Sequence, residues 1–476
     1  MKWIRLAIFG LLFAAAAVFL VRGTPPPAGE NVPDDFVIVR YWEKWTGNEG
    51  AQMRQIVDEF NATVGRQKKI HVAYMSMSAI DHKTLVATAA GVPPDIAGLW
   101  DQQVAQYAAL GAAEPLDDLA AAHGIGERTY LPVYWNGCRY ENKLYALVST
   151  PAAIALHYNK QLFSESAAKL RAAGLDPERP PRTLDELDRY AEILDQRSGP
   201  GGARLDRAGY LPLQSWYVPF TCYWFGGELF DPATQRFQLD SPQSIRAFEW
   251  IASYSRRLSI NSVQAYVSGH PMSNFDSPQN PFLAGTLVMQ QQGPWMANYI
   301  KNLKPSMSQV RVPSDQEATL ERRTDNYAWA VAPFPSAVPG LENVSYCSFD
   351  ILMIPTGARH KTEAFEFIAY VNRQDVSEKL NTLHCKNTQL RNVSASFFDH
   401  HPNPYIKVFQ ELAASPNARG VPLVPTWPEV VKQLNDAGQA VALRGADPRA
   451  VLTAAQQRVQ AQYDQFLKIQ EQRERL

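Results

Sequence analysis

The stretch "VIVRYWEKWTGNEGAQMRQIVDEFN" (residues 37–61) decides the fold, because it joins an apolar strand directly to an amphipathic helix. The strand is predicted over residues 35–42, where apolar side chains run almost without interruption. In the helix that follows, the apolar residues recur at the three- and four-residue spacing of one helical face: Met53, Ile56, Val57 and Phe60. A buried strand followed by such a helix is typical of an α/β layer built on a largely parallel sheet.

The same alternation continues along the chain. Strands are predicted over residues 69–75 and 95–100, and helices over 80–91 and 101–111. Gly91 and the prolines that follow it end the first of these helices. Repeated strand–helix units predict an α/β fold rather than an all-helical or all-β one.

Length and composition narrow the class of protein. The chain has 476 residues, and one hydrophobic core rarely serves more than about 250–300, so at least two lobes are expected. The formal net charge is −1, which gives no basic field for a nucleic acid partner. No C-x-x-C pair occurs, and no cofactor or metal site is predicted.

The N-terminus indicates export. Residues 1–23 carry Lys2 and Arg5 followed by an apolar run, which is the pattern of a signal peptide or a signal anchor. Both outcomes, cleavage and retention as a membrane anchor, are consistent with the run. Residues 24–34 read as a Pro-rich tether. We therefore expect a periplasmic or cell-surface protein.

Polar and aromatic residues follow two of the predicted strands. Trp45, Asn48 and Glu49 follow the first strand, and Trp100 and Asp101 follow the third. Ligands of open α/β sheets bind at the carboxyl ends of the strands, so Trp45 and Trp100 should converge at one edge. An indole beside a carboxylate suits the face and hydroxyls of a neutral sugar. The alternative for each Trp is packing in a core.

Other residues near these patterns are assigned different roles. Trp224 precedes a Gly-Gly turn, and Trp295 follows Gly293–Pro294 at the opening of a helix, so both are further candidates for a ligand contact. Asp95, at the opposite end of its strand, is interpreted as structural, with its carboxylate tying the preceding turn to backbone N–H groups.

Several segments occur in an order that resembles the extracellular solute-binding proteins of bacterial ABC importers, in the carbohydrate-binding branch that includes maltose-binding protein. They include residues 37–61, "AAGVPPDIAGLW" (89–100), "YENKLYALVSTPAAIALHYNKQLF" (140–163), "QQQGPWMANY" (290–299) and "KTEAFEFIAYVN" (361–372). The resemblance covers roughly residues 35–410. Each motif alone is loose, but their order is specific to the family.

The resemblance implies a periplasmic-binding-protein-like fold of type II, with two α/β lobes joined by a multi-strand hinge and a ligand cleft between them. Lobe one would comprise residues 35–150 plus 347–385. Lobe two would comprise residues 151–346 plus 386–476. The later hinge crossings would run side by side, so Cys347 and Cys385 are candidates for a disulfide; the alternative is that all four cysteines are buried thiols.

The resemblance also implies which residues face the cleft. They are Trp45, Asn48, Glu49, Trp100, Asp101, Tyr145, Trp224, Trp295, Phe349 and Asp350.

The function that follows is capture of a sugar or oligosaccharide by closure of the lobes, with delivery to the membrane subunits of an ABC permease. A monomer without enzymatic activity is expected. Two alternatives stay open at this point. One is an exported carbohydrate-active enzyme that uses paired carboxylates such as Glu49 and Asp101. The other is a membrane-tethered sugar receptor with no role in transport.

Overall fold

The computed structural model describes residues 32–308 and 327–475. The predicted signal segment (1–23) and residues 24–31 of the predicted tether lie outside the described residues. Within the two described ranges, no helix combines the length and hydropathy needed to cross a membrane.

The first lobe is built on a six-stranded sheet that contains three adjacent parallel strands, as the alternating pattern predicted. Strands β1 (Val37–Glu43), β2 (Ile70–Ser76) and β3 (Ile96–Trp100) run parallel, with β1 between the other two. The sheet continues through β14 (Ser345–Met353), which pairs antiparallel with β3 and with β6 (Leu147–Ala153). β15 (Ala418–Arg419) completes it. A segment from late in the chain thus lies beside the third strand.

Helix α2 (Gly47–Ala62) is held to this sheet by the apolar face that its sequence predicted. Its four predicted core residues are fully or almost fully buried: Met53, Ile56, Val57 and Phe60. Burying a side chain of this size stabilises the fold by about 1.5–3 kcal/mol. Because the helix starts directly after β1, its first turn is fixed at the carboxyl end of the sheet.

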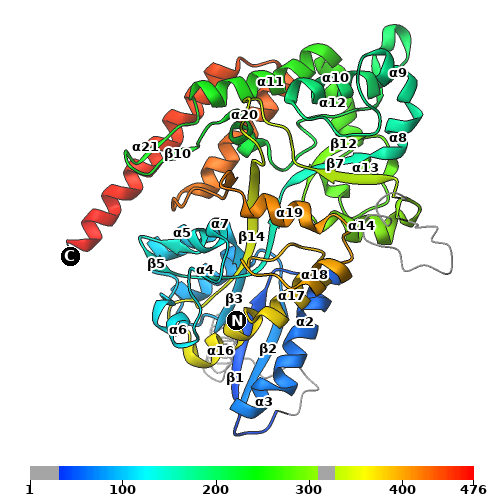
Figure 1. Ribbon diagram of the computed structural model, residues 1–476. Helices are drawn as coiled ribbons and strands as arrows, with labels where there is room; N and C mark the ends of the chain where they lie inside the picture. The colour runs from blue at the N-terminus through cyan, green and yellow to red at the C-terminus, as the bar shows by residue number, and fades with distance from the viewer. Residues whose placement is uncertain (1–31, 309–326, 476) are drawn as a thin grey trace, which may run out of the picture.

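The second lobe is centred on a smaller antiparallel sheet. β7 (Ala155–Asn159) lies between β12 (Met289–Gln292) and β13 (Trp329–Ala332). The same body contains α11 (Pro242–Leu258), α20 (Trp427–Arg444) and α21 (Pro448–Glu474), which pack on one another; α21 runs from the top of the view down its left side to the C-terminus (Figure 1).

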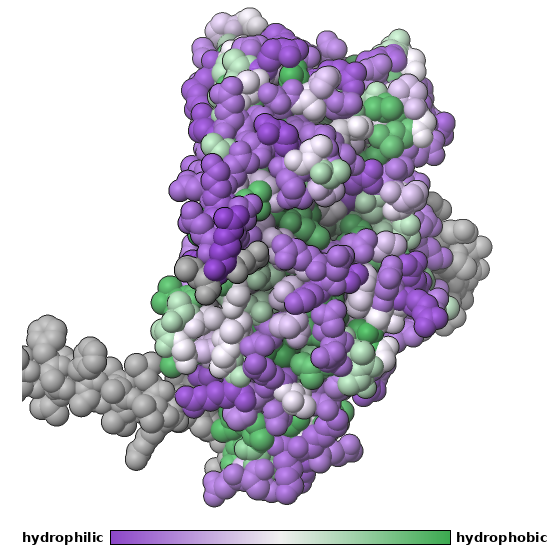
Figure 2. All heavy atoms as spheres, turned by 90° about the vertical axis from the view of Figure 1, so that its left-hand side faces the viewer, coloured by the Kyte–Doolittle hydropathy of each residue, from purple (hydrophilic) through white to green (hydrophobic). Residues whose placement is uncertain are grey.

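The two sheets are joined by short crossings of the chain. β6 of the first sheet is followed, after Ile154 alone, by β7 of the second. The chain returns from β13 to β14, which runs through the middle of the molecule (Figure 1). Seen from the left of that view, hydrophobic side chains show in a recess between the two bodies, among other places (Figure 2).

The buried side chains form two clusters. The first covers the six-stranded sheet and also reaches the smaller sheet, where Trp329 and Val331 of β13 belong to it. Residues 395–414, which the prediction placed in lobe two, contribute Phe397, Ile406 and Phe409 to the first cluster. This occurs because α19 (Ile406–Ala414) packs on β6 as well as on β7. Residues from Val421 to Tyr463 belong to the second cluster.

The Cys347–Cys385 disulfide is absent from the structure: all four cysteines are free and buried. Cys347 points toward Tyr134 from β14, and burial raises the pKa of its thiol to about 12. Cys385 instead faces Asn298, whose Oδ1 lies 3.1 Å from its Sγ. The two thiols therefore have separate partners, and the prediction of a bond between them was wrong.

Asp95 has the structural role that was predicted, although it binds other segments than the preceding turn. Its Oδ2 accepts the backbone N–H of Arg40 at 2.8 Å, and its Oδ1 accepts that of Arg359 at 3.1 Å. The buried carboxylate therefore ties β1 to the loop that follows β14.

Candidate ligand-binding site

A cavity of about 380 Å³ lies between the two bodies, at the carboxyl ends of β1 and β3. Aromatic rings and a few charged groups form its walls. The residues that line it are Trp45, Glu49, Trp100, Asp101, Gln102, Trp216, Tyr217, Phe220, Phe275, Trp295, Tyr299, Tyr346, Ser348, Phe349, Asp350, His384 and Lys386.

Seven of the ten candidate residues from the sequence line this cavity: Trp45, Glu49, Trp100, Asp101, Trp295, Phe349 and Asp350. Trp45 and Trp100 meet because β1 and β3 are parallel neighbours and both end at the same edge. Asp350 joins them because its backbone pairs with that of Trp100 in the β3–β14 register. Their role in binding a ligand stays a prediction.

Three other candidate residues lie outside the cavity wall. Asn48 is exposed on the first turn of α2. Tyr145 packs against the core of the first lobe. Trp224 is only 1% exposed, and its indole N–H donates to the carbonyl of Val344 at 3.1 Å, deep in the second lobe. Trp224 belongs to a 3₁₀ helix, η3 (Val218–Phe225), which turns Phe220 toward the cavity instead.

The sequence reading missed a second set of aromatic residues on the opposite wall. The ring centroids of Trp216 and Phe275 lie 4.7 Å apart with the planes tilted, and those of Phe275 and Tyr299 lie 4.6 Å apart, edge to face. The Tyr299 hydroxyl donates to Glu49 Oε1 at 3.3 Å, which links α14 (Met296–Leu303) to α2 across the cavity. The one sequence feature that could have indicated these residues is the frequency of aromatic side chains in "YLPLQSWYVPF" (210–220).

Trp295 lies directly before α14, and Gly293 makes room for its ring. A Cβ at Gly293 would lie 2.3 Å from the indole, so any larger residue would push the ring away. On its cavity side the ring is approached by Lys386, whose Nζ lies 5.6 Å from the ring centroid. The same ammonium group lies 4.7 Å from the ring of Trp45. Both contacts are at the distance of cation–π attraction.

The floor of the cavity is a buried network of charges centred on Asp350. Lys386 Nζ lies 2.6 Å from Asp350 Oδ2, and Lys44 Nζ lies 3.2 Å from Oδ1. The hydroxyl of Thr150 donates to Oδ2 at 2.6 Å. Burial alone would raise the pKa of Asp350, but the two ammonium groups and these hydrogen bonds lower it to about 2. Asp350 is therefore ionised.

Lys44 is also paired with Glu43, at 3.2 Å, and it donates to the carbonyl of Leu99 at 3.0 Å. The Glu43 carboxylate additionally accepts the hydroxyl of Tyr41. Gly98 on β3 leaves room for this carboxylate, since a Cβ there would lie 2.2 Å from Glu43 Oε2. The positive charge of Lys44 is therefore balanced within the protein.

Two further titratable groups of the cavity have strongly shifted pKa values. Burial, with a contribution from Asp350, raises the pKa of Asp101 well above its ordinary value. Burial and the neighbouring Lys386 lower the pKa of His384 to about 3. The His384 ring meets the Trp45 ring edge-on, with 5.7 Å between the centroids. The site thus combines an ionised carboxylate, a carboxyl group whose pKa is raised and a neutral imidazole.

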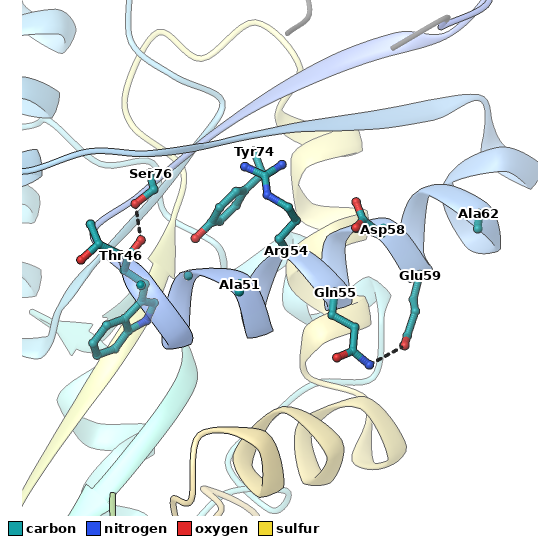
Figure 3. A pocket seen from close by; sticks show the side chains of 12 residues that line it. Thr46, Ala51, Arg54, Gln55, Asp58, Glu59, Ala62, Tyr74 and Ser76 are labelled. Carbon is teal, nitrogen blue, oxygen red and sulfur yellow. Dashed lines mark hydrogen bonds between the residues drawn. The ribbon is translucent and has the colours of Figure 1, made fainter. Parts of the chain in front are cut away.

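A second hollow, of about 690 Å³, lies on the outer side of α2 (Figure 3). Arg54 reaches over the ring of Tyr74 there, and Gln55 donates to Glu59. It is a surface groove of the first lobe alone, whereas the smaller cavity is lined from both bodies. We therefore take the smaller cavity as the candidate site. Among the described residues, no three His, Cys, Asp or Glu side chains are grouped to hold a metal ion.

The family model for bacterial extracellular solute-binding proteins matches residues 44–377. The maltotriose-binding protein of Pyrococcus abyssi is 22% identical over 261 residues, which cover 55% of this chain and 50% of that protein. The sn-glycerol-3-phosphate-binding periplasmic protein UgpB of Escherichia coli is 23% identical over 228 residues, or 46% and 50% of the two chains. The chain thus spans about half the length of these two relatives.

The fold is shared more widely than the sequence. The structure of CpMnBP1 with mannotriose bound superposes with a TM-score of 0.72 and 24% identity, covering 88% of this chain and 99% of that one. This likeness confirms the predicted two-lobed α/β fold with a cleft between the lobes.

Proposed function

The chain belongs to the bacterial extracellular solute-binding proteins, and from this premise we propose that it captures a neutral sugar or oligosaccharide in the cavity between its lobes. The main observation in support is that aromatic rings line the cavity, while the charged side chains at its base, Asp350, Lys386 and Lys44, are paired with one another. In the proposed function, the loaded protein delivers the sugar to the membrane subunits of an ABC permease.

The wall supplies the contacts that a pyranose ring needs. Trp100 and Trp216 are each 40% exposed, so both can cover the apolar C–H face of a sugar without losing packing in a core. Trp45 and Trp295 add two further indoles from opposite sides of the cavity. Removing water from such rings provides most of the affinity, and carboxylate and imidazole groups then orient the hydroxyls.

The charges favour a neutral ligand over a phosphorylated one. Lys386 is the one cation among the residues that line the cavity, and it is held by Asp350. Lys44 is held by Asp350 and Glu43. An anionic ligand would have to compete with these carboxylates for both ammonium groups. Breaking a buried ion pair in this way costs several kcal/mol, so glycerol phosphate is a poor fit.

Capture would proceed by a shift between open and closed arrangements of the lobes, because a ligand that touches both walls favours the closed one. The hydrogen bond from Tyr299 to Glu49 is one contact that would strengthen with closure. Residues 1–23 would direct export and could hold the protein at the membrane surface if they are retained. A sugar site of this kind would bind with roughly micromolar affinity, near −8 kcal/mol.

An exported glycoside hydrolase is less well supported. Such an enzyme needs one protonated and one free carboxylate beside the scissile bond. Asp101 fits the first requirement, but both oxygens of Asp350 are occupied by Lys44, Lys386 and Thr150. A carboxylate held by two ammonium groups is a weak nucleophile. We infer that ligand is bound and released unchanged.

A thermal-shift and tryptophan-fluorescence screen tests the proposal. The panel would contain neutral mono- and oligosaccharides, including maltotriose and mannotriose, with sn-glycerol 3-phosphate as the charged comparator. We expect at least one neutral saccharide to raise the melting temperature and alter the emission, without any hydrolysis product after prolonged incubation. A response to glycerol phosphate alone, or release of shorter sugars, would overturn the proposal.

A further inference from the structure

Asp101 occupies an unusual position in the candidate site. It is the first residue of the 3₁₀ turn η1 (Asp101–Gln103), which begins directly after β3. Its side chain lines the cavity but the residue is only 1% exposed. Among the described residues, its Oδ2 has no hydrogen-bond partner. A buried carboxyl oxygen without a hydrogen-bond partner destabilises the fold. Because this oxygen belongs to a residue that lines the cavity, we expect a bound ligand to supply the missing hydrogen bond.

The groups that face Asp101 explain why no cation neutralises it. The charged groups that act on its carboxyl group are Asp350 on β14, which raises its pKa, and Lys44 directly after β1, which lowers it. Lys44 directs its ammonium group to Glu43, Asp350 and the carbonyl of Leu99. Lys386 is likewise committed to Asp350 and Thr150.

The remaining titratable groups near Asp101 carry no charge at neutral pH. They are the thiols of Cys138 and Cys347 and the hydroxyls of Tyr134, Tyr223 and Tyr346. An ionised Asp101 would therefore sit beside the negative charge of Asp350 without a counter-ion of its own. Burial is the main cause that raises its pKa, Asp350 is the second, and the backbone N–H groups of Gln102 and Asp101 only partly oppose them.

We propose that Asp101 takes part in recognition as a neutral carboxylic acid that donates a hydrogen bond from Oδ2 to an ether or hydroxyl oxygen of the bound saccharide. This inference rests on the proposed sugar-binding function and deepens it. It also reverses the role first expected of this residue, which was to accept a hydroxyl proton. The floor of the cavity then offers one donor carboxyl group, Asp101, beside one acceptor carboxylate, Asp350.

The donor role has a consequence for specificity. The ring oxygen and the glycosidic oxygen of a sugar can only accept hydrogen bonds, and an ionised carboxylate would repel them. A protonated Asp101 can bind such an oxygen directly. The affinity for saccharide must then fall as the pH rises through the pKa of Asp101, because the deprotonated form has lost its donor and carries a buried charge.

Titration calorimetry with maltotriose and mannotriose between pH 5 and pH 9 tests the role of Asp101 in binding. For whichever sugar binds, the wild-type affinity should be constant at the acid end and fall by about tenfold per pH unit above the pKa of Asp101. Asp101→Asn keeps a neutral donor of the same size, so its affinity should stay within about threefold of the acid-end value and lose this pH dependence. Asp101→Ala should lose about tenfold or more. A large loss in Asp101→Asn at every pH, with a flat wild-type profile, would overturn the proposal.

The protonation state of Asp101 can also be measured without ligand, so the proposal is testable even if no sugar of the panel binds. Difference infrared spectroscopy of the wild type against Asp101→Asn should show a protonated carboxyl band at pH 7 that the variant lacks. In urea unfolding, Asp101→Asn should exceed the wild type in stability at pH 7, and the difference should shrink below about pH 4, where Asp101 is protonated in both states. Asp118→Asn, at an exposed site, is the matched control and should show neither effect. A missing band would refute the proposal on Asp101, whereas a band without sugar binding would refute only the proposed function.

Discussion

Lys386 lies 2.6 Å from the carboxylate of Asp350, and that carboxylate is also bound by the hydroxyl of Thr150. These three residues come from three segments that are far apart in the sequence: β6, β14 and the segment after α17 (Gln374–Leu383). One buried carboxylate therefore ties together the strands at which the two lobes meet. The same carboxylate forms the floor of the cavity, so the hinge region and the candidate site share one set of contacts.

Lys386→Met should destabilise the protein strongly, because it leaves Asp350 buried with only Lys44 as a counter-ion. We expect the free energy of unfolding, from urea denaturation at pH 7, to fall by about 3 kcal/mol. Lys379→Met is the matched control, since Lys379 pairs with Glu59 on the surface and its loss should cost less than about 1 kcal/mol. Equal effects of the two substitutions would show that the Lys386–Asp350 pair contributes no more than a surface pair.

The pH dependence of stability should carry the signature of Asp350. Its pKa is lowered from 3.8 in the unfolded chain to about 2 in the folded protein. A lowered pKa stabilises the folded state above the unfolded value, and this contribution is lost as the pH falls from about 4 toward 2. The loss should amount to about 2 kcal/mol for this group. Comparing urea unfolding of the wild type and Asp350→Asn at pH 5 and at pH 2.5 measures it; an equal gap between the two proteins at both values would contradict it.

The sequence was sufficient to predict the sheet of the first lobe and the edge at which Trp45 and Trp100 meet. Both follow from local rules, namely the spacing of apolar residues and the position of ligand sites at the carboxyl ends of parallel strands. Trp295 was located by the Gly-Pro break before its helix. In each case the informative residues are close together in the sequence.

The opposite wall could not be predicted because its residues are placed by tertiary packing. Trp216 lies in an irregular segment, where no periodicity fixes the direction of a side chain. Trp224 was assigned to the cleft from the Gly-Gly turn that follows it, but the 3₁₀ geometry of η3 turns it into the core. Lys386 follows a helix without any motif, and its role depends on Asp350, which is 36 residues away. The thiol of Cys385 was misassigned for the same reason.

Gly293→Ala should weaken sugar binding without unfolding the protein. The added methyl group would overlap the indole of Trp295, so the ring must swing away from the cavity and lose its stacking position. We expect an affinity loss of about 1–2 kcal/mol by calorimetry, consistent with the displacement of one interface aromatic. Gly126→Ala is the control, because no atom lies within 4 Å of a Cβ at Gly126. Unchanged affinity in Gly293→Ala would argue that Trp295 does not touch the ligand.

Substitutions of Trp216 and Trp224 should affect different quantities, namely saccharide affinity for Trp216 and the free energy of unfolding for Trp224. Trp216 is 40% exposed at the cavity wall, whereas Trp224 is 1% exposed in a core. Trp216→Ala should therefore reduce saccharide affinity by about 2 kcal/mol and leave the urea midpoint nearly unchanged. Trp224→Phe should do the reverse, because it leaves the carbonyl of Val344 without its donor and creates a small void, at a cost of about 2 kcal/mol in stability. Calorimetry and urea unfolding on both variants give four values, and a loss of affinity in Trp224→Phe with none in Trp216→Ala would move the binding site away from this cavity.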